Sequence, residues 1–336
     1  MISPTPHIWV PRTKIIEPRD PLIVGVTAAG LFRLRTIRPG GGVVKDTGWF
    51  PNLITNTGLD MFGSGSSLNR AYVGTGNSTP NVTDTALNTQ VAYGVTTQSQ
   101  TWLVNQGGDA RYCQMTSTER ISAPGSAHNL AEVGYGSSST LFSRALILNS
   151  EGIPTTISWG ADEALDVTYA LRIYPPVDDY FTTMTVAGVD YDVTIRASTT
   201  NAWGAFQGGL GASIFVSSNF AGFSGATTVY NGTIGAVTSS PSGAYAGTTS
   251  TSASSYVTGT YFREGQAIFG LTAGNVPGGI TAFRISFGRG GNGDGSYSYG
   301  RHFQLGITGG GTGAIPKTES QNMSIGWRTL WSRRSI

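Results

Sequence analysis

Apolar and polar residues alternate along several short stretches of the chain. The clearest stretch runs from Leu165 to Ile173, where every odd-numbered residue is apolar and Asp166, Thr168 and Arg172 lie between them. A period of two places successive side chains on opposite faces of a strand, so the pattern predicts a half-buried β-strand.

Two more β-prone runs precede this strand, at residues 141–148 and 153–159. Each run is followed by turn-forming residues at the spacing of a hairpin, Asn149 to Gly152 after the first and Gly160 to Glu163 after the second. The simplest interpretation is that the three runs form consecutive antiparallel strands.

Further elements are expected on both sides of this region. Residues 31–37 alternate and lead through a glycine-rich turn into Val43, which predicts a hairpin; residues 52–62 have the pattern of one short helical turn, and residues 71–74 that of a strand. Strands are also predicted in 266–271, 280–287, 302–307 and 323–331. We expect the last of these to complete the sheet begun before residue 176, since several edges would otherwise stay open.

The composition favours a fold of short strands and many turns. The chain of 336 residues contains 48 Gly, and charged residues make up 12%, about half of the usual ~25%, whereas 39% of residues are hydrophobic. We therefore expect an ordered all-β protein with an antiparallel β-sandwich body. The changes in composition divide it into an extended Pro-rich arm (1–21), a first part of the body (22–176), a Gly/Ser/Thr-rich insertion or small lobe (177–255) and strands that complete the body (256–336). Strand-like pieces in the insertion are 191–195 and 212–216.

The arm contains five prolines, which disfavour a helix or a central strand. Its apolar residues are too many for a purely solvated tail, so we expect the arm to lie along a surface of its own chain or of a neighbour. The residues predicted to bind that partner are Ile8, Trp9, Val10, Ile15 and Ile16.

Charge and cysteine content narrow the expected partners. The net charge of +2 gives no general attraction to nucleic acid, and the basic C-terminal residues are interpreted as a solvated tail or interface rim. Cys113 is the single cysteine, so the fold does not depend on an internal disulfide. No signal peptide and no run of apolar residues long enough to span a bilayer is evident, which predicts synthesis in a cytoplasm and no membrane insertion.

The sequence offers little chemistry for a metal or a cofactor. His7, His128 and His302 lack metal-ligand spacing, and neither a GxSxG elbow nor a GxxxxGK loop occurs. The glycine loop 288–295 resembles one calcium-binding nonapeptide, but such sites need stacked repeats, so a plain hairpin loop is the preferred interpretation. We expect no metal and no cofactor.

Two acidic pairs and the tryptophans are the candidate binding or catalytic groups of the sequence. Asp162 with Glu163 and Asp178 with Asp179 could cleave glycans if two carboxylates lay about 5–10 Å apart, but adjacent acids at a turn are expected in any case. Tryptophans can stack on sugars, although core packing is the preferred role here; they are Trp9, Trp49, Trp102, Trp159, Trp203, Trp327 and Trp331. No catalytic residue is assigned.

An ordered set of short motifs resembles the tail-associated structural proteins of tailed bacteriophages, known as tail or tail fibre proteins. The motifs are NLITNTGLD, YVGTGNSTP, TDTAL, NLAEVGYG, LFSRALI, GIPTTI, LDVTYALRIYPP, YVTGTYFR, GNVPGGI and AIPKTESQ. The resemblance implies a β-rich, usually oligomeric virion component without a cofactor.

The expected function is therefore a non-enzymatic virion structural protein of the tail, collar or fibre region, which acts by assembly and attachment of tail components. The expected partners are other tail or collar proteins and further copies of the chain. Two alternatives stay open. The first is a receptor- or glycan-binding adhesin at a fibre tip, which recognises its ligand through residues 177–255, and the second is a polysaccharide-degrading tailspike, although the repeats of a β-helix are missing.

Overall fold

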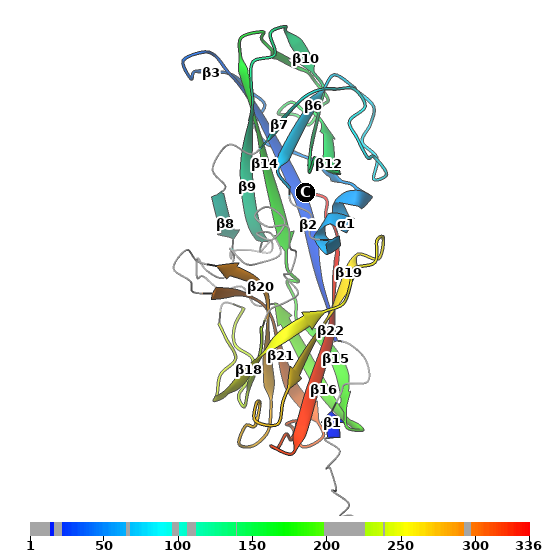
Figure 1. Cartoon of the computed structure of the whole chain (residues 1–336), viewed down its shortest axis with the longest axis vertical. Coiled ribbons are helices and arrows are strands. Elements are labelled where there is room, and N and C mark those ends of the chain that lie inside the picture. Colours follow the sequence, from blue (N-terminus) through cyan, green and yellow to red (C-terminus); the bar gives the residue numbers. More distant parts are fainter. Residues whose placement is uncertain are drawn as a thin grey trace, which may run out of the picture.

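The described residues fold into an elongated body of β-strands with one short helix (Figure 1). The computed structural model describes residues 14–16, 22–64, 68–95, 101–105, 112–138, 140–197, 226–237, 239–291 and 297–336. We call residues 30–174 the upper lobe, and residues 176–333 with 14–16 and 22–29 the lower lobe. The long strand β2 (Leu22–Ile37) belongs to both lobes.

The upper lobe contains the helix and most of the shorter strands. Besides β2, its elements are β3 (Val43–Asp46), β4 (Phe50–Pro51), β5 (Leu53–Ile54), α1 (Asn56–Ser64), β6 (Arg70–Gly74), β7 (Gln90–Val95), β8 (Thr101–Asn105), β9 (Tyr112–Ile121), β10 (His128–Leu130), β11 (Glu132–Gly136), β12 (Leu141–Leu146), β13 (Ile157–Trp159) and β14 (Ala164–Tyr174).

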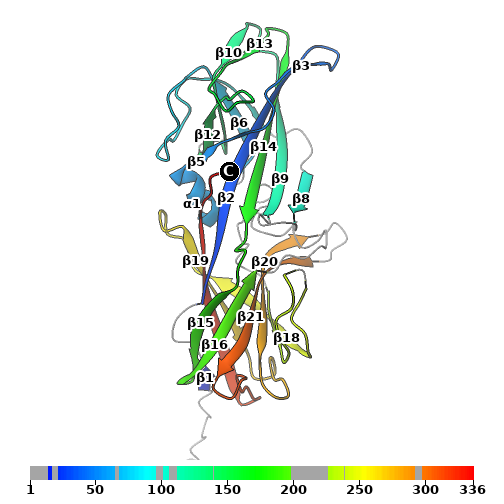
Figure 2. The same cartoon turned by 180° about the vertical axis from the view of Figure 1, so that it is seen from behind.

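The lower lobe consists of longer strands that run along the molecule (Figure 2). They are β1 (Lys14–Ile16), β15 (Tyr180–Val186), β16 (Val189–Ala197), β17 (Ala226–Tyr230), β18 (Tyr245–Ala253), β19 (Phe262–Phe269), β20 (Ala282–Gly291), β21 (Tyr297–Gly310) and β22 (Gln321–Arg333).

One large sheet of 15 strands connects the two lobes, in the order β15-β16-β21-β20-β17-β18-β19-β22-β2-β14-β9-β8. In addition, β1 pairs with β22, and β3 and β4 pair with β2. β2 joins the lobes because its first part pairs with β22 and its second part with β14. The all-β prediction is confirmed. The sheet is mixed rather than purely antiparallel, because β22 pairs in parallel with both β1 and β2.

A second sheet, in the order β5-β12-β11-β6-β7, packs on the upper part of the large sheet. Tyr169 of β14 lies between the two sheets, stacked on Tyr135 of β11 with ring centroids 4.5 Å apart and tilted against Phe32 of β2 at 4.9 Å. All three rings are fully buried. The inner faces of the two sheets thus form one aromatic core.

The prediction of three consecutive antiparallel strands at 141–173 holds only for the ends of the first two runs, where Leu148 and Pro154 form an antiparallel bridge. Beyond this bridge it is wrong, because β12 lies in the second sheet, β13 pairs with β10, and β14 pairs with β2 and β9 in the large sheet. The turn residues between the runs are real, but the chain crosses from one layer to the next at these turns. Burial of Tyr169 between the sheets places β14 beside β2 rather than beside its neighbour in sequence.

Several other sequence predictions are confirmed. β2 and β3 form the expected hairpin, α1 occupies the expected helical segment, and β22 completes the sheet begun before residue 176. The strands of 177–255 are built into the large sheet, because β16 pairs with β21, β17 with β20 and β18 with β19. The predicted strand at 212–216 lies outside the described residues. No helix in the described part of the chain is long and apolar enough to cross a membrane.

Candidate functional site

A pocket of about 400 Å³ lies in the lower lobe, next to the point where the chain passes from β14 to β15. β2 contributes Ile23, Val24 and Gly25 to its wall, while β15, β16 and β21 contribute the opposite wall. Because β2 is far from β15 in the strand order, the sheet must curl back on itself to bring both to one pocket.

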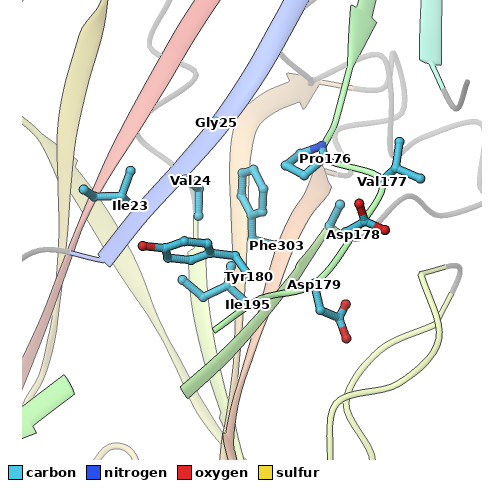
Figure 3. A pocket seen from close by; sticks show the side chains of 11 residues that line it. Ile23, Val24, Gly25, Pro176, Val177, Asp178, Asp179, Tyr180, Ile195 and Phe303 are labelled. Atoms are coloured by element: carbon cyan, nitrogen blue, oxygen red, sulfur yellow. The ribbon is translucent and has the colours of Figure 1, made fainter. Parts of the chain in front are cut away.

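The floor of the pocket is apolar. Val24, Ile195 and Phe303 are buried and face the same space, and the ring of Tyr180 reaches across it toward β2 (Figure 3). The linker residues Pro176 to Asp179 form one side of the mouth.

Exposed apolar side chains surround this pocket. Among the residues that line it, Tyr180 is 52% exposed, Ile23 47% and Val177 45%. Single exposed apolar residues are common on protein surfaces, but a group of them beside an apolar pocket is typical of a binding surface. We call these three residues and the pocket the lower-lobe docking site.

β15 supplies a free backbone edge next to this docking site. Within the described part of the chain it pairs only with β16, to which it is joined by a tight turn with positive φ at Ala187 and Gly188. Its sequence, YFTTMTV, contains no lysine, no proline and no charged residue, which are the usual means of blocking an edge. An extended peptide could therefore add to this edge.

The two acids at the mouth have different roles. Asp179 accepts hydrogen bonds from Arg196 Nε at 2.8 Å and Nη2 at 2.6 Å, and Arg196 Nη1 donates to the carbonyl of Gly235 at 2.8 Å. The hydrogen bonds from Arg196 hold the pKa of Asp179 below its usual value. Asp178 is exposed and takes part in none of the ion pairs formed among the described residues.

The other acidic pair has a structural role in its turn. The side chain of Glu163 accepts a hydrogen bond from the amide of Gly160 at 3.0 Å, and its carbonyl accepts one from Trp159 Nε1 at 2.7 Å. These bonds close the turn between β13 and β14, in agreement with the interpretation of Asp162 and Glu163 as turn residues.

Sequence reasoning missed a buried ionic network in the upper lobe. Glu132 is fully buried and pairs with Arg144 at 2.8 Å, and Arg144 also binds Asp84 at 2.7 Å. Glu132 accepts further hydrogen bonds from the backbone amides of one loop, those of Gly76 (3.1 Å), Asn88 (2.9 Å) and Thr89 (2.6 Å). The network holds the loop between β6 and β7 against the sheet. Its only sequence signal is one acid and one base in the otherwise uncharged strands NLAEVGYG and LFSRALI.

A second buried carboxylate lies between the sheets of the upper lobe. Glu119 accepts hydrogen bonds from Ser117 Oγ at 2.8 Å and from the hydroxyl of Tyr135 at 2.5 Å. Burial, followed by the charge of Glu119, raises the pKa of Tyr135 well above its usual value, so the phenol stays protonated and donates. This carboxylate also serves the packing of the core.

The predicted partner-binding residues lie partly outside the description. Ile15 and Ile16 are in β1, which pairs in parallel with β22 of the same chain, and Ile8, Trp9 and Val10 lie outside the described residues.

His128 is in β10, and the described residues contain no group of acids, histidines and cysteine that could hold a metal ion. β20 and β21 pair as a hairpin around the glycine loop, whose residues 292–296 lie outside the description.

The tryptophans divide between core and surface. Trp159, Trp327 and Trp331 are buried, as the core interpretation predicted, whereas Trp49 is 44% exposed. Trp9, Trp203 and the side chain of Trp102 lie outside the description.

Known proteins do not identify the chain. Neither protein-family models, nor curated proteins, nor solved structures match it. Its function must therefore be argued from the geometry and from the sequence.

Proposed function

We propose that the chain is a non-enzymatic structural protein of a tailed-bacteriophage virion, located in the tail, collar or fibre region, which acts by assembly. The observation that carries this proposal is the lower-lobe docking site, in which a free strand edge lies directly beside an apolar pocket and exposed aromatic rings. Such an edge supplies backbone hydrogen bonds to an added strand, and the pocket supplies specificity for its side chains.

The placement of the acidic residues supports an assembly role. Glu132 and Glu119 are buried in hydrogen-bond networks, Asp179 pairs with Arg196, and Glu163 closes a turn. These four acids therefore act within the fold, whereas the exposed Asp178 and the exposed apolar surface are available to a partner.

Purified virions test this proposal directly. Antibodies raised against the chain should label phage particles at the tail in electron micrographs, and the chain should co-purify with particles at a fixed copy number. Particles that lack the chain after removal of soluble protein would refute the proposal.

A glycan- or receptor-binding adhesin is the second candidate, because the segment 177–255 carries exposed aromatic rings. Phe181 is 71% exposed and Tyr245 62% exposed. Aromatic faces stack on sugars, so these rings could recognise a surface glycan. Binding of the purified chain to host cells that is lost in Phe181→Ser and Tyr245→Ser variants would favour this function, and no binding at micromolar concentration would exclude it.

A further inference from the structure

We propose that the lower-lobe docking site binds the N-terminal arm of a second copy of this chain. In this contact, residues His7–Val10 of one copy lie along the edge of β15 in the other, Trp9 fills the pocket and Arg12 faces Asp178. The inference rests on the proposed assembly function and deepens it, because it names the segment through which copies associate.

The pocket matches the arm in size and chemistry. About 400 Å³ falls within the ~300–1,000 Å³ of ligand pockets and accommodates an indole ring. The buried floor formed by Val24, Ile195 and Phe303 offers apolar contacts to such a ring (Figure 3). Trp9 is the largest apolar residue of the arm and lies between Ile8 and Val10.

The backbone of the arm suits an edge position. Between Pro6 and Pro11 four successive residues carry an amide donor, enough for a short strand beside β15. The prolines on either side lack a donor, which is tolerated at a sheet edge and stops further strands from adding.

The charges of the arm and of the pocket mouth are complementary as well. Arg12 follows Trp9 by three residues, and Lys14 follows Arg12, whereas Asp178 and Asp179 lie at the mouth of the pocket. Asp179 is already paired with Arg196, which leaves the exposed Asp178 as the carboxylate that can face an incoming cation.

Strand register favours an arm supplied by another copy. Lys14 pairs with Gln321, whereas Ile23 at the pocket pairs with Arg328, seven residues further along β22, or about 23 Å at ~3.3 Å per residue. Trp9 is five residues before Lys14, and five extended residues span at most ~18 Å, which is less than the distance from Lys14 to the level of Ile23.

Self-association of the full chain tests the contact. Sedimentation over a concentration series should show oligomers of the wild type, with association at least tenfold weaker in Trp9→Ala. Trp49→Ala removes an exposed tryptophan of the upper lobe and serves as the matched control, which should associate like the wild type. A wild type that stays monomeric up to high micromolar concentration, or equal behaviour of the two tryptophan variants, would overturn the proposal.

A charge exchange tests the register. Arg12→Asp and Asp178→Arg should each weaken association several-fold, and the variant that combines them should recover most of the loss. Asp178 is exposed, so circular dichroism should show unchanged folding of the Asp178→Arg variant. Failure of the combined variant to recover would overturn the assigned pairing.

Particle composition separates this inference from the proposed function. Virions that contain Trp9→Ala at the normal copy number would refute the arm contact and leave the virion role intact. A chain that associates through Trp9 in solution but is absent from virions would refute the virion role alone.

Discussion

The two lobes differ in how deeply they bury ion pairs and in where an apolar pocket lies beside a strand edge. The upper lobe buries an ionic network, formed by Glu132 and Arg144 with Asp84 at its edge, between the second sheet and the loop that joins β6 to β7. In the lower lobe, the ion pairs among the described residues are partly exposed, those of Arg196 with Asp179 and of Arg328 with Glu264, and the strand edge of β15 is open beside exposed aromatic rings.

This difference suggests a division of roles. The charges of a buried ion pair compensate each other only in one arrangement of the side chains. We therefore propose that the buried network restricts the upper lobe of this protein to a single internal packing. The lower lobe combines an open strand edge with an apolar pocket at its surface, which favours association. The following predictions test this comparison, from the largest expected effect to the smallest.

Loss of Glu132 should destabilise the protein most. Glu132→Ala removes the partner of the buried Arg144 and leaves the amides of Gly76, Asn88 and Thr89 without their acceptor, so the free energy of unfolding should fall by about 3–5 kcal/mol. Urea unfolding measures this change. Glu264→Ala, which breaks the partly exposed pair with Arg328, is the matched control and should lower it by less than about 1 kcal/mol. Equal effects would contradict the contrast between the lobes.

Two glycines of the same strand compare the packing of the lobes. Gly30 in the upper lobe lies against the hydroxyl of Tyr169 and the side chain of Asn52, so Gly30→Ala should lower stability by about 1–3 kcal/mol through overpacking. Gly25 in the lower lobe has open space where a Cβ would be, and Gly25→Ala should be neutral or stabilise by up to about 1 kcal/mol. Thermal unfolding distinguishes the two variants, and a similar loss at both positions would show that the lower lobe is packed as tightly as the upper.

Low pH should remove the small contribution that the ion pair of Asp179 with Arg196 makes to the free energy of unfolding. The pKa of Asp179 is lowered in the folded state by hydrogen bonds from Arg196, so its stabilising effect is complete above the unfolded pKa of ~3.9 and is lost as the pH falls through the lower folded value. Asp179→Asn should therefore lower the unfolding free energy by less than about 1 kcal/mol at pH 7, and the difference from the wild type should be smaller at pH 2. Unfolding curves measured between pH 2 and pH 7 provide the comparison, and a difference that grows toward low pH would reverse the assigned sign.

The sequence predicted individual elements better than their pairing. The alternation at Leu165–Ile173 correctly located β14, but the prediction of a half-buried strand is wrong, because the polar face with Asp166 and Thr168 is buried as well. The strands that pair with β14 could not be predicted from the alternation, because their positions depend on Tyr169 packing between Phe32 and Tyr135, which belong to distant strands. The first part of β2 was missed because Gly25, Ala28 and Ala29 weaken the apolar pattern.

The candidate site was predictable only in part. Sequence analysis identified the apolar arm and noted Asp178 and Asp179 as a pair. It could not show that β2, β15, β16 and β21 meet at one pocket, because the curling of the sheet brings together residues more than a hundred positions apart, such as Val24 and Phe303. The role of Arg196 in holding Asp179 depends on the same three-dimensional arrangement.

Hydrogen exchange along β15 tests the central claim most directly. Every second amide of β15 points away from β16, and these amides should be protected in the full chain at concentrations where copies associate. In a chain that lacks residues 1–13 but keeps β1, the same amides should exchange quickly, while those of β14 in the upper lobe stay protected in both chains. Equal exchange of the outward β15 amides with and without the arm would contradict the account.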